Sequence, residues 1–256
     1  MMKSCSDLMR MIKSAEGMTR MVQLYGSREG EVARQMERYM LLLKRHEDLF
    51  GTEKMPLLVS APGRTELCGN HTDHNNGRVL AAAVNLDTVA AVSPRDDLQI
   101  TLHSEGFAPI RVDLNNLSPV KEEQGTPASI IRGIAARMQE MGCMVRGFDG
   151  TATSNVLSGS GLSSSAAFEV LICAIFDALY NGMKVDPIER ARIAQYAENV
   201  YFGKPCGLMD QMASSVGGLV AIDFKAEPKV TPLQYDFAAR GYSLIVVNTG
   251  GSHDDL

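Results

Sequence analysis

The spacing of apolar residues along the chain changes near residue 57. Between residues 31 and 50 apolar side chains recur every three to four positions and Gly51 follows, which predicts an amphipathic helix. From Leu57 the apolar residues form short runs, LLVS and DTVAAVS, or alternate, as in the segment 98–102, which predicts strands. The pattern predicts two parts: an N-terminal helical extension, residues 1–54, and a mixed domain, residues 55–256.

Boundary residues predict further helices within the mixed domain. Thr126 and Pro127 provide a cap and a first-turn proline for a helix that runs to Met141, before Gly142. Asp186 and Pro187 begin another helix in the same way, and it is expected to end near residue 201. A long apolar helix is expected over about 164–180, with strands at 147–156, 218–224 and 242–247. Helices and strands that alternate irregularly predict an α+β fold rather than a bundle or a sandwich.

Composition excludes several classes of function. The 256 residues carry a net charge of -5, with 25 Lys and Arg against 30 Asp and Glu, so no basic surface predicts a nucleic-acid partner. No uninterrupted apolar run reaches the length of a membrane span, and the polar, Met-rich N-terminus lacks the apolar core of a secretory signal. Five scattered cysteines with no C-x-x-C pair favour reduced thiols. These features predict a cytoplasmic protein that does not cross a membrane; they leave its oligomeric state open.

The segment SGSGLSSSAA, residues 158–167, lies between a predicted strand and the long apolar helix. Its glycines allow close backbone approach, its serines offer hydroxyls, and the helix that follows directs free N–H groups at the loop. A flexible turn is the plain alternative. The segment lacks the G-K-[ST] of a Walker A loop and the third glycine of a dinucleotide-binding fingerprint. It predicts a phosphate-binding loop.

The segment APGRTELCGNHTDHNNG, residues 61–77, is expected to follow a strand as a loop. It gathers one Arg, two His, one Asp and three Asn, a density of hydrogen-bonding groups suited to a polyol such as a sugar. Two alternatives stay open, a solvated turn and a metal site. His71 and His74 flank Asp73, but no Cys or Glu completes a zinc pattern.

The segment 197–218 carries two acidic candidates. Asp210 is expected in the first turn of a short helix, where the helix dipole would lower its pKa and keep it ionised as an acceptor for a hydroxyl proton. Glu198 could bind a divalent cation, since Mg²⁺ is held by one or two carboxylates plus nucleotide phosphates. The alternative for Asp210 is an ordinary helix-start charge. Cys206 is interpreted as a packing residue.

Together the three segments resemble, in order, the motifs of the galactokinases in the GHMP small-molecule kinase superfamily. PGR followed by GNHTDHNNG resembles the sugar signature, GSGLSSSAA the ATP loop, and PCGLMDQ the segment with the catalytic aspartate. The resemblance covers roughly residues 57–256. It implies an α+β GHMP kinase N-terminal lobe, a mixed sheet with packed helices. Since family members continue into a second, ferredoxin-like lobe, the chain is expected to be an N-terminal fragment or truncated product, inactive or nearly so by itself.

The resemblance implies transfer of the ATP γ-phosphoryl group to the anomeric hydroxyl of galactose. Asp210 would take or direct the hydroxyl proton, while Arg64 would lower that hydroxyl's pKa and offset phosphoryl charge. The phosphates would be enclosed by Gly159, Ser160, Gly161, Leu162, Ser163, Ser164 and Ser165. Ser165 and Glu198 would bind Mg²⁺. The sugar would be held by Asn70, His71, Thr72, Asp73 and Gly207, and Ser104 would touch the nucleotide.

Three positions depart from the family pattern: Asn70 replaces a sugar-contacting Glu, His74 replaces Tyr, and Leu157 stands where proline is usual. Another sugar therefore stays open as the substrate. A non-catalytic sensor of galactose and ATP is a second alternative. Sensors of that kind resemble the enzymes but lack residues of the serine-alanine stretch, which is complete here over 163–167. Kinases of homoserine or mevalonate lack the sugar signature.

Overall fold

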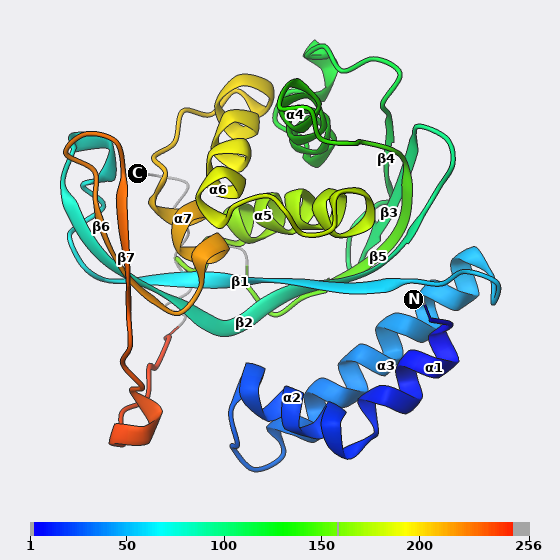
Figure 1. Cartoon of the computed structure of the whole chain (residues 1–256), viewed down its shortest axis with the longest axis horizontal. Helices are drawn as coiled ribbons and strands as arrows, with labels where there is room; N and C mark the ends of the chain where they lie inside the picture. The colour runs from blue at the N-terminus through cyan, green and yellow to red at the C-terminus, as the bar shows by residue number, and fades with distance from the viewer. Residues whose placement is uncertain (1–2, 158, 248–256) are drawn as a thin grey trace.

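The computed structural model describes residues 3–157 and 159–247. One mixed β-sheet lies between two layers of helices (Figure 1). Three N-terminal helices cover one face: α1 (Cys5–Ile12), α2 (Ala15–Tyr25) and α3 (Glu31–Phe50). Four helices cover the other face: α4 (Pro127–Glu140), α5 (Ser164–Phe176), α6 (Pro187–Tyr196) and α7 (Met209–Val216). The predicted α+β class, a mixed sheet with packed helices, is confirmed.

The sheet is organised around one long strand. In space the order is β4-β3-β5-β2-β6-β7, and β1 pairs with β2 along its other edge. The first part of β2 pairs with β6 and its last part with β5, so β2 spans both halves of the sheet. All pairs are antiparallel except β3 with β5. The strands are β1 (Leu57–Cys68), β2 (Arg78–Pro94), β3 (Gln99–Ser104), β4 (Ile110–Asp113), β5 (Phe148–Ser154), β6 (Leu219–Asp223) and β7 (Lys229–Leu233).

Helix α5 forms the centre of the main core. Its residues 170–176 are buried on every side between the sheet and its neighbours α4 and α6, and the ring of Phe176 meets that of Phe148 on β5. The segment Ser164–Asn181, α5 and its helical continuation, is also long and apolar enough to span a membrane. Because 61% of this segment is buried inside the protein, its composition is that of an interior helix.

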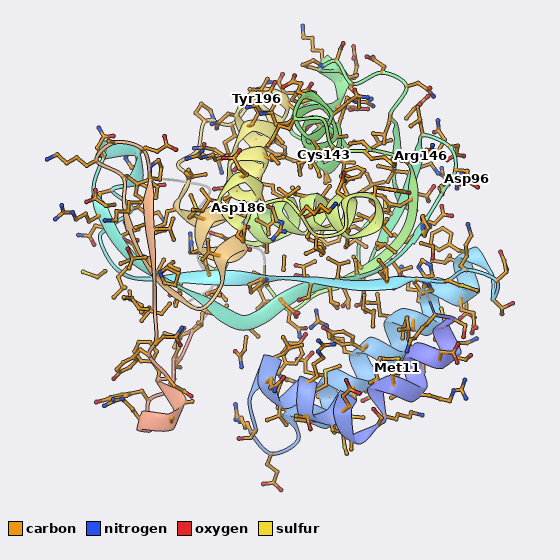
Figure 2. All side chains as sticks on the ribbon, in the orientation of Figure 1. Met11, Asp96, Cys143, Arg146, Asp186 and Tyr196 are labelled. Carbon is orange, nitrogen blue, oxygen red and sulfur yellow. The ribbon has the colours of Figure 1, made fainter. Side chains whose placement is uncertain are left out.

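The N-terminal helices are joined to the sheet by a buried polar cluster. Asp87 on β2 is 4% exposed. It accepts hydrogen bonds from Arg38 Nη1 at 2.6 Å and from the Tyr25 hydroxyl at 2.7 Å. Around this cluster the apolar faces of α1, α2 and α3 pack against Val89 and Ala91. Side chains project from both helical layers and from the sheet into the space between them (Figure 2).

Most boundaries predicted from the pattern are confirmed. Helix α3 spans the predicted 31–50, α5 begins at Ser164, and Asp186 caps α6 by accepting from the Ile188 N–H at 2.8 Å. Beyond α6 a π-helical turn, Ala197–Phe202, continues the helix to about the predicted end. Thr126 is an exception, because its hydroxyl bonds backward to the Glu123 carbonyl and does not cap α4.

Two strand predictions are wrong, and two strands were not predicted. The sugar-signature segment does not follow a strand, because β1 itself runs through Cys68 and carries the first half of the segment. Strands β4 and β7 were not expected. Residues 242–247 form no strand, and their apolar side chains are exposed, as with Ile245 at 80%. A strand needs a hydrogen-bonded neighbour, and no described strand pairs with this segment.

Candidate active site

Strand β1 places Arg64 at the centre of the site. A register shift against β2 lies between Pro62 and Arg64. At Gly63 a Cβ would come within 2.9 Å of the Leu162 carbonyl oxygen, so only glycine lets the loop that precedes α5 lie this close. The Arg64 N–H donates to that carbonyl at 3.0 Å, and Arg64 Nη1 donates to the Gly161 carbonyl at 2.6 Å. The same residue thus holds both the strand and the loop.

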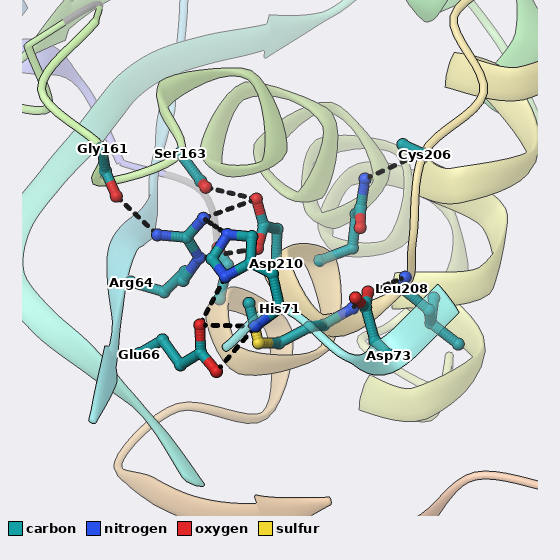
Figure 3. A network of polar contacts seen from close by, with 12 residues as sticks. Arg64, Glu66, His71, Asp73, Gly161, Ser163, Cys206, Leu208 and Asp210 are labelled. Carbon is teal, nitrogen blue, oxygen red and sulfur yellow. Dashed lines mark hydrogen bonds and ion pairs between the residues drawn. The ribbon is translucent and has the colours of Figure 1, made fainter. Parts of the chain in front are cut away.

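Arg64 and Asp210 form a bidentate ion pair. Nε and Nη2 of Arg64 each donate to one carboxylate oxygen of Asp210 at 2.7 Å (Figure 3). The Arg64 side chain is 5% exposed and that of Asp210 is 31% exposed, so the carboxylate keeps one side open to a ligand. The Ser163 hydroxyl also donates to Asp210.

The pKa of Asp210 lies below its ordinary value, as expected, but for a different reason. Burial acts to raise this pKa, and the hydrogen bonds and positive charge of Arg64, with the Ser163 hydroxyl, more than offset it. The predicted cause was the dipole of α7, a helix of eight residues. The paired guanidinium keeps Asp210 ionised.

The Gly/Ser loop ends at the uncapped start of α5. Gly159 and Gly161 have φ of 72° and 73°, and Ser163, the residue before the helix, has φ of 56°. Ser163 does not cap the helix with its side chain, because its hydroxyl turns toward Asp210. The first N–H groups of α5 therefore lack a side-chain acceptor, which is the arrangement that binds phosphate at a helix start. Ser158, at the beginning of the predicted loop, lies outside the described residues.

Asp73 fastens the sugar-signature loop to the start of α7. Its Oδ2 accepts from the backbone N–H groups of Leu208 and Met209 at 2.9 and 3.0 Å (Figure 3). A Cβ at Gly207 would lie 1.8 Å from the same oxygen, so this position requires glycine. Thr72 supports the loop from within by donating to the Gly69 carbonyl at 2.8 Å. These contacts bring the loop next to Asp210.

Two buried acids lie behind Asp210 on the side of α5 and α6. Gln211 Nε2 donates to Oε2 of Glu169 and to Oε2 of Glu198, each at 3.0 Å. All three side chains belong to residues exposed by 6% or less. Burial and the neighbouring Glu198 raise the pKa of Glu169 well above its usual range. The Gln211 Oε1 is buried without a hydrogen-bond partner in the described structure.

A cleft of about 180 Å³ joins these groups. Its lining residues are His71, Asp73, His74, Ser165, Glu198, Lys204, Cys206, Gly207, Asp210 and Gln211. Six of them were predicted site residues, and Arg64, Gly161 and Ser163 join the same network through hydrogen bonds to or around Asp210. A larger apolar cavity of about 380 Å³, between α1, α2 and β1, shares none of these residues.

The remaining predicted residues lie near the cleft or away from its lining. Leu162 is buried beneath the Gly/Ser loop against Val156 and Ala167. Ser104 ends β3 on the far side of β5 from β2. Outside the lining residues are also Asn70, Thr72, Gly159, Ser160 and Ser164. Their roles stay predictions.

Sequence reasoning missed three polar groups at the site. Lys204 and Gln211 line the cleft, and Glu66 on β1 contacts His71. Gln211 directly follows Asp210, and that adjacency was an available signal. Cys206 also lines the cleft, but burial and Glu198 raise the pKa of its thiol, so a protonated thiol in a packing role agrees with the prediction.

Two family models match the chain. Residues 44–94 match the galactokinase galactose-binding signature, and residues 129–218 match the GHMP kinases N-terminal domain. The galactokinase of Streptomyces coelicolor is 37% identical over 215 residues, which cover 82% of this chain and 54% of that protein. The galactokinase of Bacillus subtilis is 34% identical over 171 residues, covering 66% of this chain and 44% of that one. The chain thus spans about half the length of these relatives.

Solved structures give the same grouping. The Lactococcus lactis galactokinase complexed with galactose superimposes with a TM-score of 0.68 at 27% identity, over 76% of this chain and 51% of that one. The mevalonate kinase of Methanococcus jannaschii has a TM-score of 0.59 at 16% identity, over 72% and 57% of the two chains, and supports the fold alone.

Proposed function

Because this chain belongs to the GHMP kinase superfamily and carries the galactose-binding signature of the galactokinases, we propose that it acts in transferring the γ-phosphoryl group of ATP to the anomeric hydroxyl of galactose. The observation that carries the proposal is the Arg64–Asp210 pair. It lies where the sugar-signature loop, the Gly/Ser loop and the start of α7 meet. We place the protein in the cytoplasm, as its sequence predicts.

Asp210 is the residue that receives or directs the sugar hydroxyl proton. It is ionised, partly exposed toward the cleft, and fixed by three hydrogen bonds that leave it little freedom to reorient. Phosphoryl transfer needs little covalent chemistry from the protein, so positioning and charge supply most of the effect. Arg64, nearly buried, adds a positive charge that stabilises both the developing alkoxide and the phosphoryl oxygens.

The nucleotide phosphates lie at the uncapped start of α5. Backbone N–H groups and the hydroxyls of the serine run serve as donors, and the 13-residue helix adds its dipole. Kinases of this superfamily use ATP. Because the loop itself contains no lysine, the phosphate charge is neutralised by Arg64, by Lys204 at the cleft and by a cation.

The residues at the cleft fit a Mg²⁺ ion. Ser165 and Glu198 line the same cleft and offer a hydroxyl and a carboxylate oxygen, the ligand class that Mg²⁺ prefers. The buried carbonyl oxygen of Gln211, beside Glu198 and without a partner in the described structure, suits a water bound to such an ion. Bound Mg²⁺ would offset negative charge on the phosphates. Gln211 keeps the Glu198 carboxylate oriented while the ion is absent.

The sugar occupies the part of the cleft beside the signature loop. His71, Asp73 and Gly207 line it, and Thr72 keeps the loop folded. Asp73 holds α7 with Oδ2, and its Oδ1 lies 3.5 Å from His74 Nδ1, a contact long enough for a ligand hydroxyl to replace. Asn70 is exposed, and its neutral amide replaces the family's carboxylate; this departure supports a kinase of another sugar as the second candidate.

A coupled assay of ADP release across a panel of monosaccharides tests the proposal, carried out on a version of the protein as long as its relatives, since this chain spans about half their length. We expect Mg²⁺-dependent turnover in which galactose or a close epimer is preferred. Calorimetric titration of the same sugars separates a kinase from a sensor, because a sensor would bind sugar and ATP without releasing ADP. Absence of both sugar binding and turnover with every sugar in the panel would refute the assignment.

A further inference from the structure

Glu66 makes three contacts with one residue of the signature loop. Its carboxylate accepts from the backbone N–H of His71 at 3.0 and 3.1 Å and also meets the His71 Nδ1 (Figure 3). The Glu66 side chain is only 12% exposed, although it lies on the edge strand β1. A carboxylate held this way at the base of a loop organises that loop.

The backbone of the loop bends around this carboxylate in an unfavourable conformation. Asn70 and His71 have φ of 57° and 50°, values that non-glycine residues adopt rarely, and Gly69 has φ of 132°. At Gly69 a Cβ would come within 2.8 Å of Glu66 Oε1, so the chain passes too close for a side chain. The contacts with Glu66 compensate for the strain of two successive residues at positive φ.

The other ring nitrogen of His71 shows which tautomer is present. His71 Nε2 lies 3.4 Å from Arg64 Nη2, which can only donate a hydrogen bond. Because Nε2 accepts, the ring proton is on Nδ1, and the Nδ1–H donates a hydrogen bond to the Glu66 carboxylate. Both neighbours therefore select the same neutral imidazole.

We propose that Glu66 is a positioning residue that holds His71 as the Nδ1-protonated imidazole, so that a hydroxyl of the sugar donates to Nε2 in place of the long 3.4 Å contact with Arg64 Nη2. The role in sugar binding rests on the proposed function; the tautomer does not. Glu66 touches His71 and acts on the ligand through it. Since His71 lines the cleft, the orientation of its ring selects among sugars by where a hydroxyl points.

Nuclear magnetic resonance of the ligand-free protein at pH 8 tests the tautomer directly. We expect the ¹⁵N shifts of His71 to show a protonated Nδ1 and an unprotonated Nε2. In Glu66→Ala the population should move toward the Nε2-protonated form, whereas Glu122→Ala, at an exposed acid on the turn before α4, should leave it unchanged. A wild-type His71 protonated at Nε2 would overturn the proposal, even if the protein is a kinase.

A double-mutant cycle tests whether Glu66 acts through His71. Calorimetry with galactose should show binding weakened by about ten- to a hundredfold in Glu66→Ala, the loss expected for a charge-assisted hydrogen bond, while Mg·ATP binding stays within about twofold. In a His71→Ala background the Glu66 substitution should add less than about twofold. Equal losses in both backgrounds would overturn the proposal, since Glu66 would then act independently of His71.

If the alanine variant does not fold, Glu66→Gln still tests the proposal. The amide retains one acceptor oxygen without the charge, so we expect a smaller loss of sugar affinity and a mixed tautomer population. Glu66→Gln with wild-type tautomer and affinity would contradict the need for a carboxylate. If wild type binds no sugar, the proposed function fails, and the tautomer measurement still decides the role of Glu66.

Discussion

His46 lies fully buried where α3 packs on the sheet. Nε2 pairs with the Ser93 hydroxyl at 2.8 Å, and burial lowers the pKa of His46 to about 4 from 6.5. The nearby carboxylate of Asp149 opposes this shift only in part. The imidazole is therefore neutral in the folded protein at every pH above about 5 and must gain a proton in acid.

The linkage between this pKa and stability has a definite sign and size. Because the pKa of His46 is lower in the folded protein, the unfolded chain binds a proton at this residue first as the pH falls. The stability that the neutral imidazole allows is therefore complete above pH 6.5 and is lost as the pH falls toward 4. Between pH 7 and pH 5 the two pKa values give a loss of about 2 kcal/mol in the free energy of unfolding, and the limiting loss below pH 4 is about 3 kcal/mol.

Urea unfolding at pH 5, 6 and 7 measures this effect by comparison. We expect wild type to lose about 2 kcal/mol more over that range than His46→Gln, which cannot titrate. His74→Gln, at a histidine whose side chain is 62% exposed, serves as the control and should follow wild type. Identical pH slopes for wild type and His46→Gln would refute the reasoning.

Two further substitutions test the site. Glu169→Gln should make the fold more stable than wild type at pH 8. The pKa of Glu169 is raised in the folded protein, so this carboxyl favours folding below its unfolded pKa of 4.5 and costs stability as the pH rises. Urea midpoints at pH 5 and 8 should show that the advantage of the variant shrinks in acid. Gly207→Ala should cost a few kcal/mol of stability and most of the sugar affinity, because the new Cβ would displace Asp73 Oδ2 from the start of α7. In an Asp73→Ala background the same change should cost much less. An equal cost in that background would contradict the geometry.

Local sequence signals were enough for the elements whose ends are set by one or two residues. Pro187 after Asp186 predicts the start of α6, and Ser164 begins α5 three residues after Gly161. These boundaries depend on caps and on φ preferences, which act within a few residues. The Gly/Ser loop before α5 and the helix-start position of Asp210 could be predicted for the same reason.

Features that depend on distant residues could not be predicted in this way. The segment 242–247 has the composition of a strand, yet composition cannot supply a pairing partner. The Arg64–Asp210 pair joins positions 146 residues apart. The shift in the Asp210 pKa was predicted in direction but assigned to the wrong cause. Glu66 belongs to no motif that we could interpret from the sequence. Its contact with His71 becomes visible only in the folded backbone of residues 69–71.

The central claim is that Asp210 takes part in phosphoryl transfer to a sugar. Transfer of labelled phosphate from [γ-³²P]ATP to galactose tests it most directly, in a version of the protein as long as its relatives. Asp210→Asn should lower the rate about 10²- to 10⁴-fold while nucleotide affinity, measured by calorimetry, stays within about twofold of wild type. Asp223→Asn, at a partly exposed aspartate on β6 that pairs with Arg78, is the matched control and should retain wild-type transfer. Near wild-type transfer by Asp210→Asn would contradict the account.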